Sequence, residues 1–120
     1  MNIEELRSLC LGLPDVTEDI KWGNDLCFLI NEKMFCVTGL NSSPVMISLK
    51  VTDEEFDELT AKNGIIPAPY VARYKWILIQ DTNVVSPKQL EKLIRQSYEL
   101  IKMKQAKSKK KNLRGKKSKV

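Results

Sequence analysis

Basic and aromatic side chains alternate in one short segment of the chain, in a pattern that suits the binding of an anion. Residues 59–80 contain no acid but three cations and three aromatic rings: Lys62, Arg73, Lys75, Tyr70, Tyr74 and Trp76. Cations beside aromatic faces fit a nucleic-acid backbone with its neighbouring bases, or an acidic peptide. The alternative is structural, with Trp76 opening a buried strand and Tyr70 packing against the prolines.

A second basic segment ends the chain. Residues 102–120 hold ten of the twenty Lys and Arg residues and none of the fifteen acids, so this segment carries +10 and residues 1–101 carry −5. Such a segment attracts phosphates and releases counterions, which gives weak, salt-sensitive and sequence-independent affinity. It has no aromatic ring on which a base could stack, and a solubilising tail is the alternative. With Leu113 as its only large apolar residue past Met103, we expect no membrane partner.

The candidate nucleic-acid-binding residues come from these two segments and from the end of the strand expected at 45–50. They are Lys50, Tyr70, Arg73, Lys75, Trp76, Lys107, Lys109, Lys110, Lys111, Arg114, Lys116, Lys117 and Lys119. The expected partner is DNA or RNA, bound weakly and with strong salt dependence. An unidentified protein, held as a peptide or as a partner subunit, is the second hypothesis.

Residues for catalysis or for metal binding are missing from the pattern. The chain has no histidine, so the most common general base is absent. Neither GxxxxGK[ST] nor GxGxxG occurs. The acids at 53–58 fit the solvated first turns of a helix, and Asp15, Glu18 and Asp19 match no oxygen-ligand loop. We therefore expect no enzymatic activity, no metal and no cofactor.

The cysteines and the N-terminus favour a cytoplasmic protein. Cys10, Cys27 and Cys36 are odd in number, form no CxxC and lie among apolar neighbours, which is typical of reduced, buried thiols. The first ten residues contain two acids and no long apolar run, unlike a secretory signal. No segment approaches the roughly 18–20 apolar residues that span a bilayer.

Capping residues and apolar spacing predict three helices. The first covers 3–11, with Asn2 as its N-cap and Glu5 completing a capping box, and Gly12 and Pro14 end it. The second opens at the box TDEE (52–55), with Asn63-Gly64 as its left-handed stop. The third begins after Ser86 and extends to about 106. Its core face is Leu90, Leu93, Ile94, Tyr98 and Ile101.

Short apolar or alternating runs predict strands at 16–22, 25–30, 34–40, 45–50 and 76–80. In the first of them Val16, Ile20 and Trp22 share one side. The order is α-β-β-β-β-α-β-α. We therefore expect an α+β fold, in which an antiparallel sheet of about five strands carries helices packed on one face. Residues 1–102 form the domain, and residues 103–120 form a basic, disordered C-terminal tail.

Several segments together are similar to one known family. They are LPDVTED, WG at 22–23, DLCFLINEKMFCV, ISLKVTDEEFDEL, IIPAPYVARYKWILI and LEKLIRQSYELI. Over residues 3–102 the chain resembles the MmcQ/YjbR family of small bacterial proteins. The positions that match the family pattern are Pro14, Trp22, Gly23, Lys50, Pro67, Tyr70, Trp76, Ser97 and Tyr98.

The resemblance implies a compact α/β fold related to CyaY-like and secretion-chaperone-like domains. It also implies DNA binding, which is the label often attached to the family, and no established enzymatic activity. Many members carry histidine between the Pro-x-x-Tyr turn and the tryptophan, where this chain has Val71, Ala72, Arg73 and Tyr74. A family role that needs an imidazole therefore does not transfer to this chain.

Overall fold

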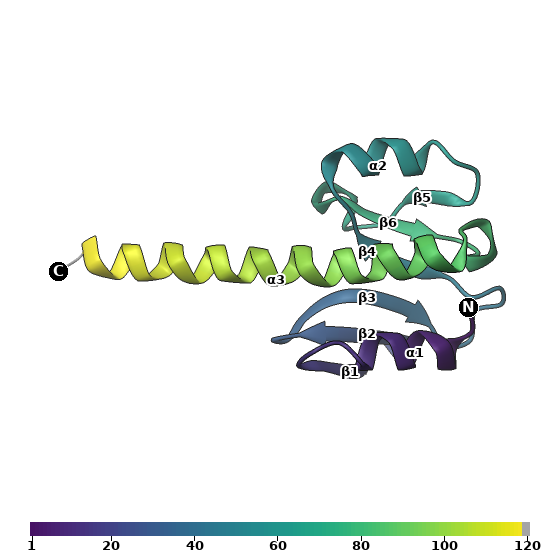
Figure 1. Cartoon of the computed structure of the whole chain (residues 1–120), viewed down its shortest axis with the longest axis horizontal. Coiled ribbons are helices and arrows are strands. Elements are labelled where there is room, and N and C mark those ends of the chain that lie inside the picture. The colour runs from purple at the N-terminus through teal and green to yellow at the C-terminus, as the bar shows by residue number, and fades with distance from the viewer. Residues whose placement is uncertain (119–120) are drawn as a thin grey trace.

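The computed structural model describes the backbone of residues 1–118 and the side chains of residues 1–105. Three α-helices, six strands and two short 3-10 helices make up the fold (Figure 1). The helices are α1 (Ile3–Leu11), α2 (Asp53–Thr60) and α3 (Pro87–Ser118), and the 3-10 helices are η1 (Ala72–Tyr74) and η2 (Thr82–Val84). The strands are β1 (Val16–Lys21), β2 (Asp25–Ile30), β3 (Lys33–Gly39), β4 (Ile47–Lys50), β5 (Ile65–Pro67) and β6 (Trp76–Ile79).

The strands form one antiparallel sheet in the order β1-β2-β3-β4-β6-β5. This confirms the predicted α+β class, with one addition: the sequence predicts about five strands and the sheet has a sixth, β5. That strand is only three residues long and ends on Pro67, at the edge of the sheet where a proline costs no ladder hydrogen bond. Its length and its proline hid it from the strand pattern.

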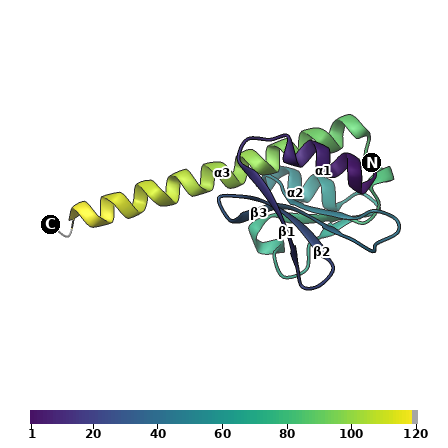
Figure 2. The same ribbon diagram turned by 90° about the horizontal axis from the view of Figure 1, so that it is seen from below.

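The helices pack on one side of this sheet, as predicted. α3 runs across β3 and β4, while α1 lies beside β1 and α2 beside β5 and β6 (Figures 1 and 2). The core between the two layers is one apolar cluster, and it includes all five residues of the predicted core face of α3. Cys10, Cys27 and Cys36 are buried free thiols, as their apolar surroundings predict.

The three predicted N-caps are confirmed. Asn2 and Glu5 form a capping box at α1, and Thr52 and Glu55 form one at α2. Ser86 Oγ accepts a hydrogen bond of 3.2 Å from the backbone N–H of Gln89, so α3 begins where Ser-Pro predicts. Gly64 takes a φ of +88°, which is the left-handed conformation expected after α2.

The C-terminal part of the chain differs from its prediction. The sequence predicts a helix end near residue 106 with a disordered segment beyond, whereas α3 continues to Ser118. Lys, Arg and Gln are all good helix formers, which favours this continuation. The side chains of residues 106–120 lie outside the described residues, as do the eight candidate phosphate-binding residues among them. They are Lys107, Lys109, Lys110, Lys111, Arg114, Lys116, Lys117 and Lys119.

Candidate nucleic-acid interface

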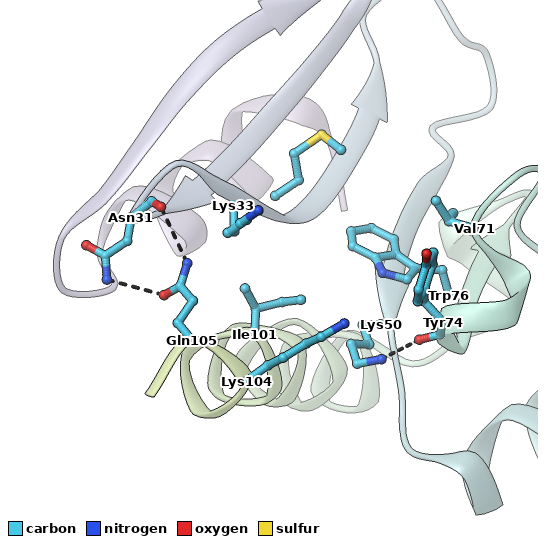
Figure 3. Close-up of a pocket in the computed structure, with 10 residues that line it drawn as sticks. Asn31, Lys33, Lys50, Val71, Tyr74, Trp76, Ile101, Lys104 and Gln105 are labelled. Carbon is cyan, nitrogen blue, oxygen red and sulfur yellow. Dashed lines mark hydrogen bonds between the residues drawn. The ribbon is translucent and has the colours of Figure 1, made fainter. Parts of the chain in front are cut away.

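A cationic cavity of about 580 Å³ opens at one end of the sheet, between the β2–β3 turn, η1 and α3 (Figure 3). Three of the described lysines line it: Lys33, Lys50 and Lys104. Its apolar wall includes Met34, Val71, Trp76 and Ile101. None of the described acidic residues lines this cavity. A concave surface with apolar walls and a few converging charges is the usual form of a ligand site, and the charges here select an anion.

Lys50 is held in place through its backbone. It is the last residue of β4 and pairs with Trp76. Its N–H donates to Ser97 Oγ on α3 at 3.0 Å, and that hydroxyl donates to the Phe35 carbonyl at 2.6 Å. The Lys50 side chain donates to the Tyr74 carbonyl. The strand end and the helix together therefore aim Lys50 at the cavity.

The Lys50 ammonium is partly removed from water. Burial lowers its pKa below the ordinary value of 10.5, and the positive charges of Lys104 and Lys75 lower it further, while Asp53 opposes them. A desolvated ammonium beside other cations is stabilised by an incoming negative charge. The lowered pKa therefore marks Lys50 as a group that gains from binding an anion.

Tyr74 joins the cations at the rim. Arg73 lies with its guanidinium carbon 4.7 Å from the Tyr74 ring centroid, and its Nη2 donates to Tyr74 Oη at 2.7 Å. Lys104 Nζ lies 5.1 Å from the centroid of the same ring. Because these contacts fix two flexible cations on one aromatic ring, less side-chain entropy is lost when they bind a phosphate.

The α3 wall of the cavity is anchored at Gln105. Its Nε2 donates to the Ile30 carbonyl at 2.8 Å. Its Oε1 accepts from Asn31 Nδ2 at 3.2 Å, and its Nε2 also contacts the Asn31 carbonyl at 3.4 Å (Figure 3). These contacts lie three residues past the boundary predicted at 102. The helical turn that carries Lys104 and Gln105 thus belongs to the site, although composition assigns it to the basic tail.

A second cavity of about 550 Å³ adjoins the first. Both cavities are lined by Met34, Val71 and Trp76, so they are neighbours, and we call the two together the groove. Trp22, from the β1–β2 turn, and Tyr70, from the loop after β5, line only the second cavity. The groove therefore combines an aromatic half with a cationic half.

Trp22 and Tyr70 are held in an unusual way. Their side chains are 72% and 99% exposed, and their φ values are +53° and +69°. Left-handed backbone is uncommon for a bulky residue and costs on the order of 1–3 kcal/mol. Exposed rings return none of this energy through burial, so stability of the fold does not explain their position.

The structure brings some predicted residues together and separates others. Lys50 and Trp76 line the first cavity, Tyr70 and Trp76 line the second, and Arg73 lies on Tyr74 at the rim. Lys75 is directed elsewhere: its Nζ lies 4.9 Å from the ring centroid of Phe56 on α2, and it lines neither cavity.

The structural alternatives predicted for Trp76 and Tyr70 have different outcomes. Trp76 does open a buried strand, with 8% of its surface exposed, yet that part lines both cavities. The idea that Tyr70 is packed against the prolines is wrong, because its side chain is almost fully exposed. The strand predicted at 16–22, with Val16, Ile20 and Trp22 on one side, is one residue too long. β1 ends at Lys21, so Trp22 lies beyond the strand, and the side chains of Ile20 and Trp22 are exposed.

Sequence reasoning missed three residues of the groove. Lys33 follows a two-residue turn, Asn31-Glu32, whose positive φ values allow β2 and β3 to pair tightly. Lys104 lies in the basic segment, and the composition of that segment does not distinguish it from the other lysines there. Trp22 carries a signal, since it belongs to the family pattern, but the sequence assigns it to the strand predicted at 16–22, whereas β1 ends at Lys21.

The described residues contain neither a cluster of metal ligands nor a helix that could cross a membrane. No group of three or more acidic or cysteine side chains in that part of the chain is placed to hold a metal ion. No helix within it combines the length and the apolar character that crossing a membrane requires.

Comparisons with known proteins place the chain in a family. The model of the YjbR family matches residues 11–100. A crystal structure from Deinococcus radiodurans with a domain of the family DUF419 superposes with a TM-score of 0.78 at 27% identity, covering 83% of this chain and 78% of that one. A crystal structure from Pseudomonas syringae gives a TM-score of 0.68 at 25% identity, covering 83% and 98%. No curated protein matches the chain. Since the family model covers three quarters of its length, this chain belongs to the YjbR family.

Proposed function

We propose that this protein binds nucleic acid without acting on it as an enzyme. The observation that carries the proposal is a cavity with three lysines and no described carboxylate, in a domain whose residues 1–101 carry a net −5. Such a domain repels a polyanion on average, so attraction is confined to this groove and to the basic C-terminal segment. The exposed rings beside the lysines supply the stacking partners that nucleic acid uses.

The two basic regions have different roles in this proposal. The segment 102–120, with its charge of +10, provides long-range and sequence-independent attraction. Lys33, Lys50 and Lys104 provide short-range contacts to phosphates at a fixed place. Each phosphate contact to a single strand contributes about 0.7 to the slope of log affinity against log salt. The three groove lysines together therefore account for about 2 of that slope.

Fluorescence anisotropy of a labelled oligonucleotide over a salt series tests the proposal. We expect the triple variant Lys33→Gln, Lys50→Gln, Lys104→Gln to bind more weakly and to lower the slope by about 2. The matched control is Lys62→Gln, Lys88→Gln, Lys92→Gln, which removes the same charge from exposed positions outside the groove. Equal effects of the two triple variants would show that the groove is not the site. No binding at about 50 mM salt would refute nucleic-acid binding altogether.

An acidic peptide is the second candidate, because the same cations and rings fit carboxylates. Competition separates the two. If nucleic acid is the partner, unlabelled oligonucleotide displaces the labelled one and polyglutamate of equal charge does so poorly. A polyglutamate that competes better than the oligonucleotide would favour the peptide.

A further inference from the structure

We infer that the groove selects single strands by holding one unpaired nucleotide, with its base between Trp22 and Tyr70 and its phosphate on Lys50 and Lys104. This inference rests on the proposed function and names the kind of nucleic acid and the contacts. It starts from the order of the two adjoining cavities, one aromatic and one cationic. A nucleotide has the same order, with an aromatic ring joined to an anion.

The aromatic cavity has the parts that a base requires. Trp22 and Tyr70 line it from two different loops, and both rings are exposed to an incoming base. Its walls include Val37, Ala68 and the accessible part of Trp76. Stacking on aromatic side chains is tolerant of sequence because every base has a π face. Stacking alone therefore does not discriminate among the four bases.

One polar group in this cavity can contact the edge of the base. Asp25, at the start of β2, is the only acidic residue among the described residues that line the cavity. A carboxylate accepts hydrogen bonds from exocyclic amino groups, such as the N4 amino group of cytosine. It lines the cavity that Trp22 lines, while Lys33, Lys50 and Lys104 line the other cavity. For a base with an exocyclic amino group, this separation gives the nucleotide a direction in the groove, with its amino edge toward Asp25 and its phosphate toward Lys50.

Duplex nucleic acid cannot use the aromatic cavity. In a duplex the base is stacked and paired, so its faces are closed to protein side chains unless it leaves the helix, which costs unstacking energy. A duplex thus meets only the cations of this protein, whereas a single strand meets the cations and the rings. The difference predicts tighter binding of single strands, and it depends on Trp22 and Tyr70.

The experiment compares one sequence of about 12 nucleotides as a single strand and as a duplex, with the full chain. For the single strand we expect Tyr70→Ala and Trp22→Ala each to lower affinity about 5-fold or more. For the duplex we expect a change below about 2-fold. Tyr70→Phe and Trp22→Phe keep a ring and are expected to retain the affinity of the unchanged chain. Because both side chains are exposed, the alanine variants should fold, and their urea midpoints verify this.

The outcomes separate this inference from the proposed function. If the single strand and the duplex both bind, and the alanine variants bind them as the unchanged chain does, the nucleotide site is refuted and nucleic-acid binding stands. If neither the single strand nor the duplex binds at low salt, the proposed function fails and the inference fails with it. A single strand of abasic nucleotides gives a second measurement. We expect it to bind no better than the duplex, and affinity equal to that of the normal strand would overturn the inference.

Discussion

Ser97→Ala tests how the fold holds the floor of the groove. A bulge shifts the register of β2 and β3 so that Phe28 pairs with Cys36 and Leu29 with Met34, which leaves Phe35 without a partner across the pair. On its other side β3 pairs with β4 from Thr38 to Cys36, opposite Ile47 to Leu49. The next pair in that register would be Phe35 and Lys50. The Ser97 hydroxyl lies between them, accepting from Lys50 N–H and donating to Phe35 C=O.

The magnitude follows from burial. Ser97 is fully buried, so its removal leaves one donor and one acceptor without a partner and without access to water. A buried unsatisfied group costs about 1–3 kcal/mol, and we expect the two groups together to lower the free energy of unfolding by about 2–6 kcal/mol in Ser97→Ala. With an m-value of about 1.5 kcal/mol/M, the urea midpoint then falls by roughly 1–4 M.

Urea unfolding followed by far-UV circular dichroism measures this change. The control is Ser48→Ala, on β4 like Lys50, where the residue lines the second cavity and no described residue hydrogen-bonds to its hydroxyl. We expect the control to change stability by less than about 0.5 kcal/mol. A loss below about 0.5 kcal/mol for Ser97→Ala would refute the bridging role and the account of how Lys50 is positioned.

Three further predictions concern the domain. Tyr98→Phe removes the 2.7 Å hydrogen bond from Tyr98 Oη to the Pro14 carbonyl but keeps the edge-to-face contact with Phe35. Urea unfolding should therefore show that the free energy of unfolding falls by about 1 kcal/mol. An unchanged free energy would mean that water replaces the bond. A hydrogen bond from Arg7 lowers the pKa of Glu18 below 4.5, so this pair stabilises the fold above that pH and its contribution is lost as pH falls through the lower folded value. Glu18→Gln should therefore reduce the fall in urea midpoint between about pH 7 and about pH 3, and an unchanged fall would contradict the pairing. Burial raises the pKa of the Cys27 thiol, and the hydrogen bond with Cys10 together with burial raises the pKa of the Cys36 thiol. An aromatic disulfide reagent should therefore titrate the three thiols quickly in urea and slowly in the native protein. A quick reaction of the native protein would contradict their burial.

Local signals in the sequence were sufficient for the helices. Each helix start is marked by a capping signal within four residues, and the structure confirms all three starts. The signals are Asn2 with Glu5, Thr52 with Glu55, and Ser86 before Pro87. The inward face of α3 follows from spacing alone, because a helix this long repeats its pattern several times. β5 has three residues and two prolines nearby, so it offers no pattern to detect.

The groove depends on contacts between distant parts of the chain. Lys104 reaches the cavity because α3 crosses the sheet and is tied to the β2–β3 turn by Gln105, 75 residues after its partner Ile30. Lys75 adjoins Trp76 in the sequence, yet its own left-handed backbone, with a φ of +67°, directs its side chain toward Phe56 on α2. Neither outcome is encoded in local spacing, so the basic-aromatic segment indicated the right region but not the right set of cations.

Titration of the full chain with a single-stranded oligonucleotide, followed by NMR, tests the central claim most directly. The claim is that the groove binds the oligonucleotide, and that the basic segment 102–120 only adds long-range attraction for it. We expect the indole N–H signals of Trp22 and Trp76 and the ammonium signals of Lys33, Lys50 and Lys104 to shift together with a single affinity. Shifts confined to residues 106–120, with those of both indoles unchanged at saturation, would contradict it.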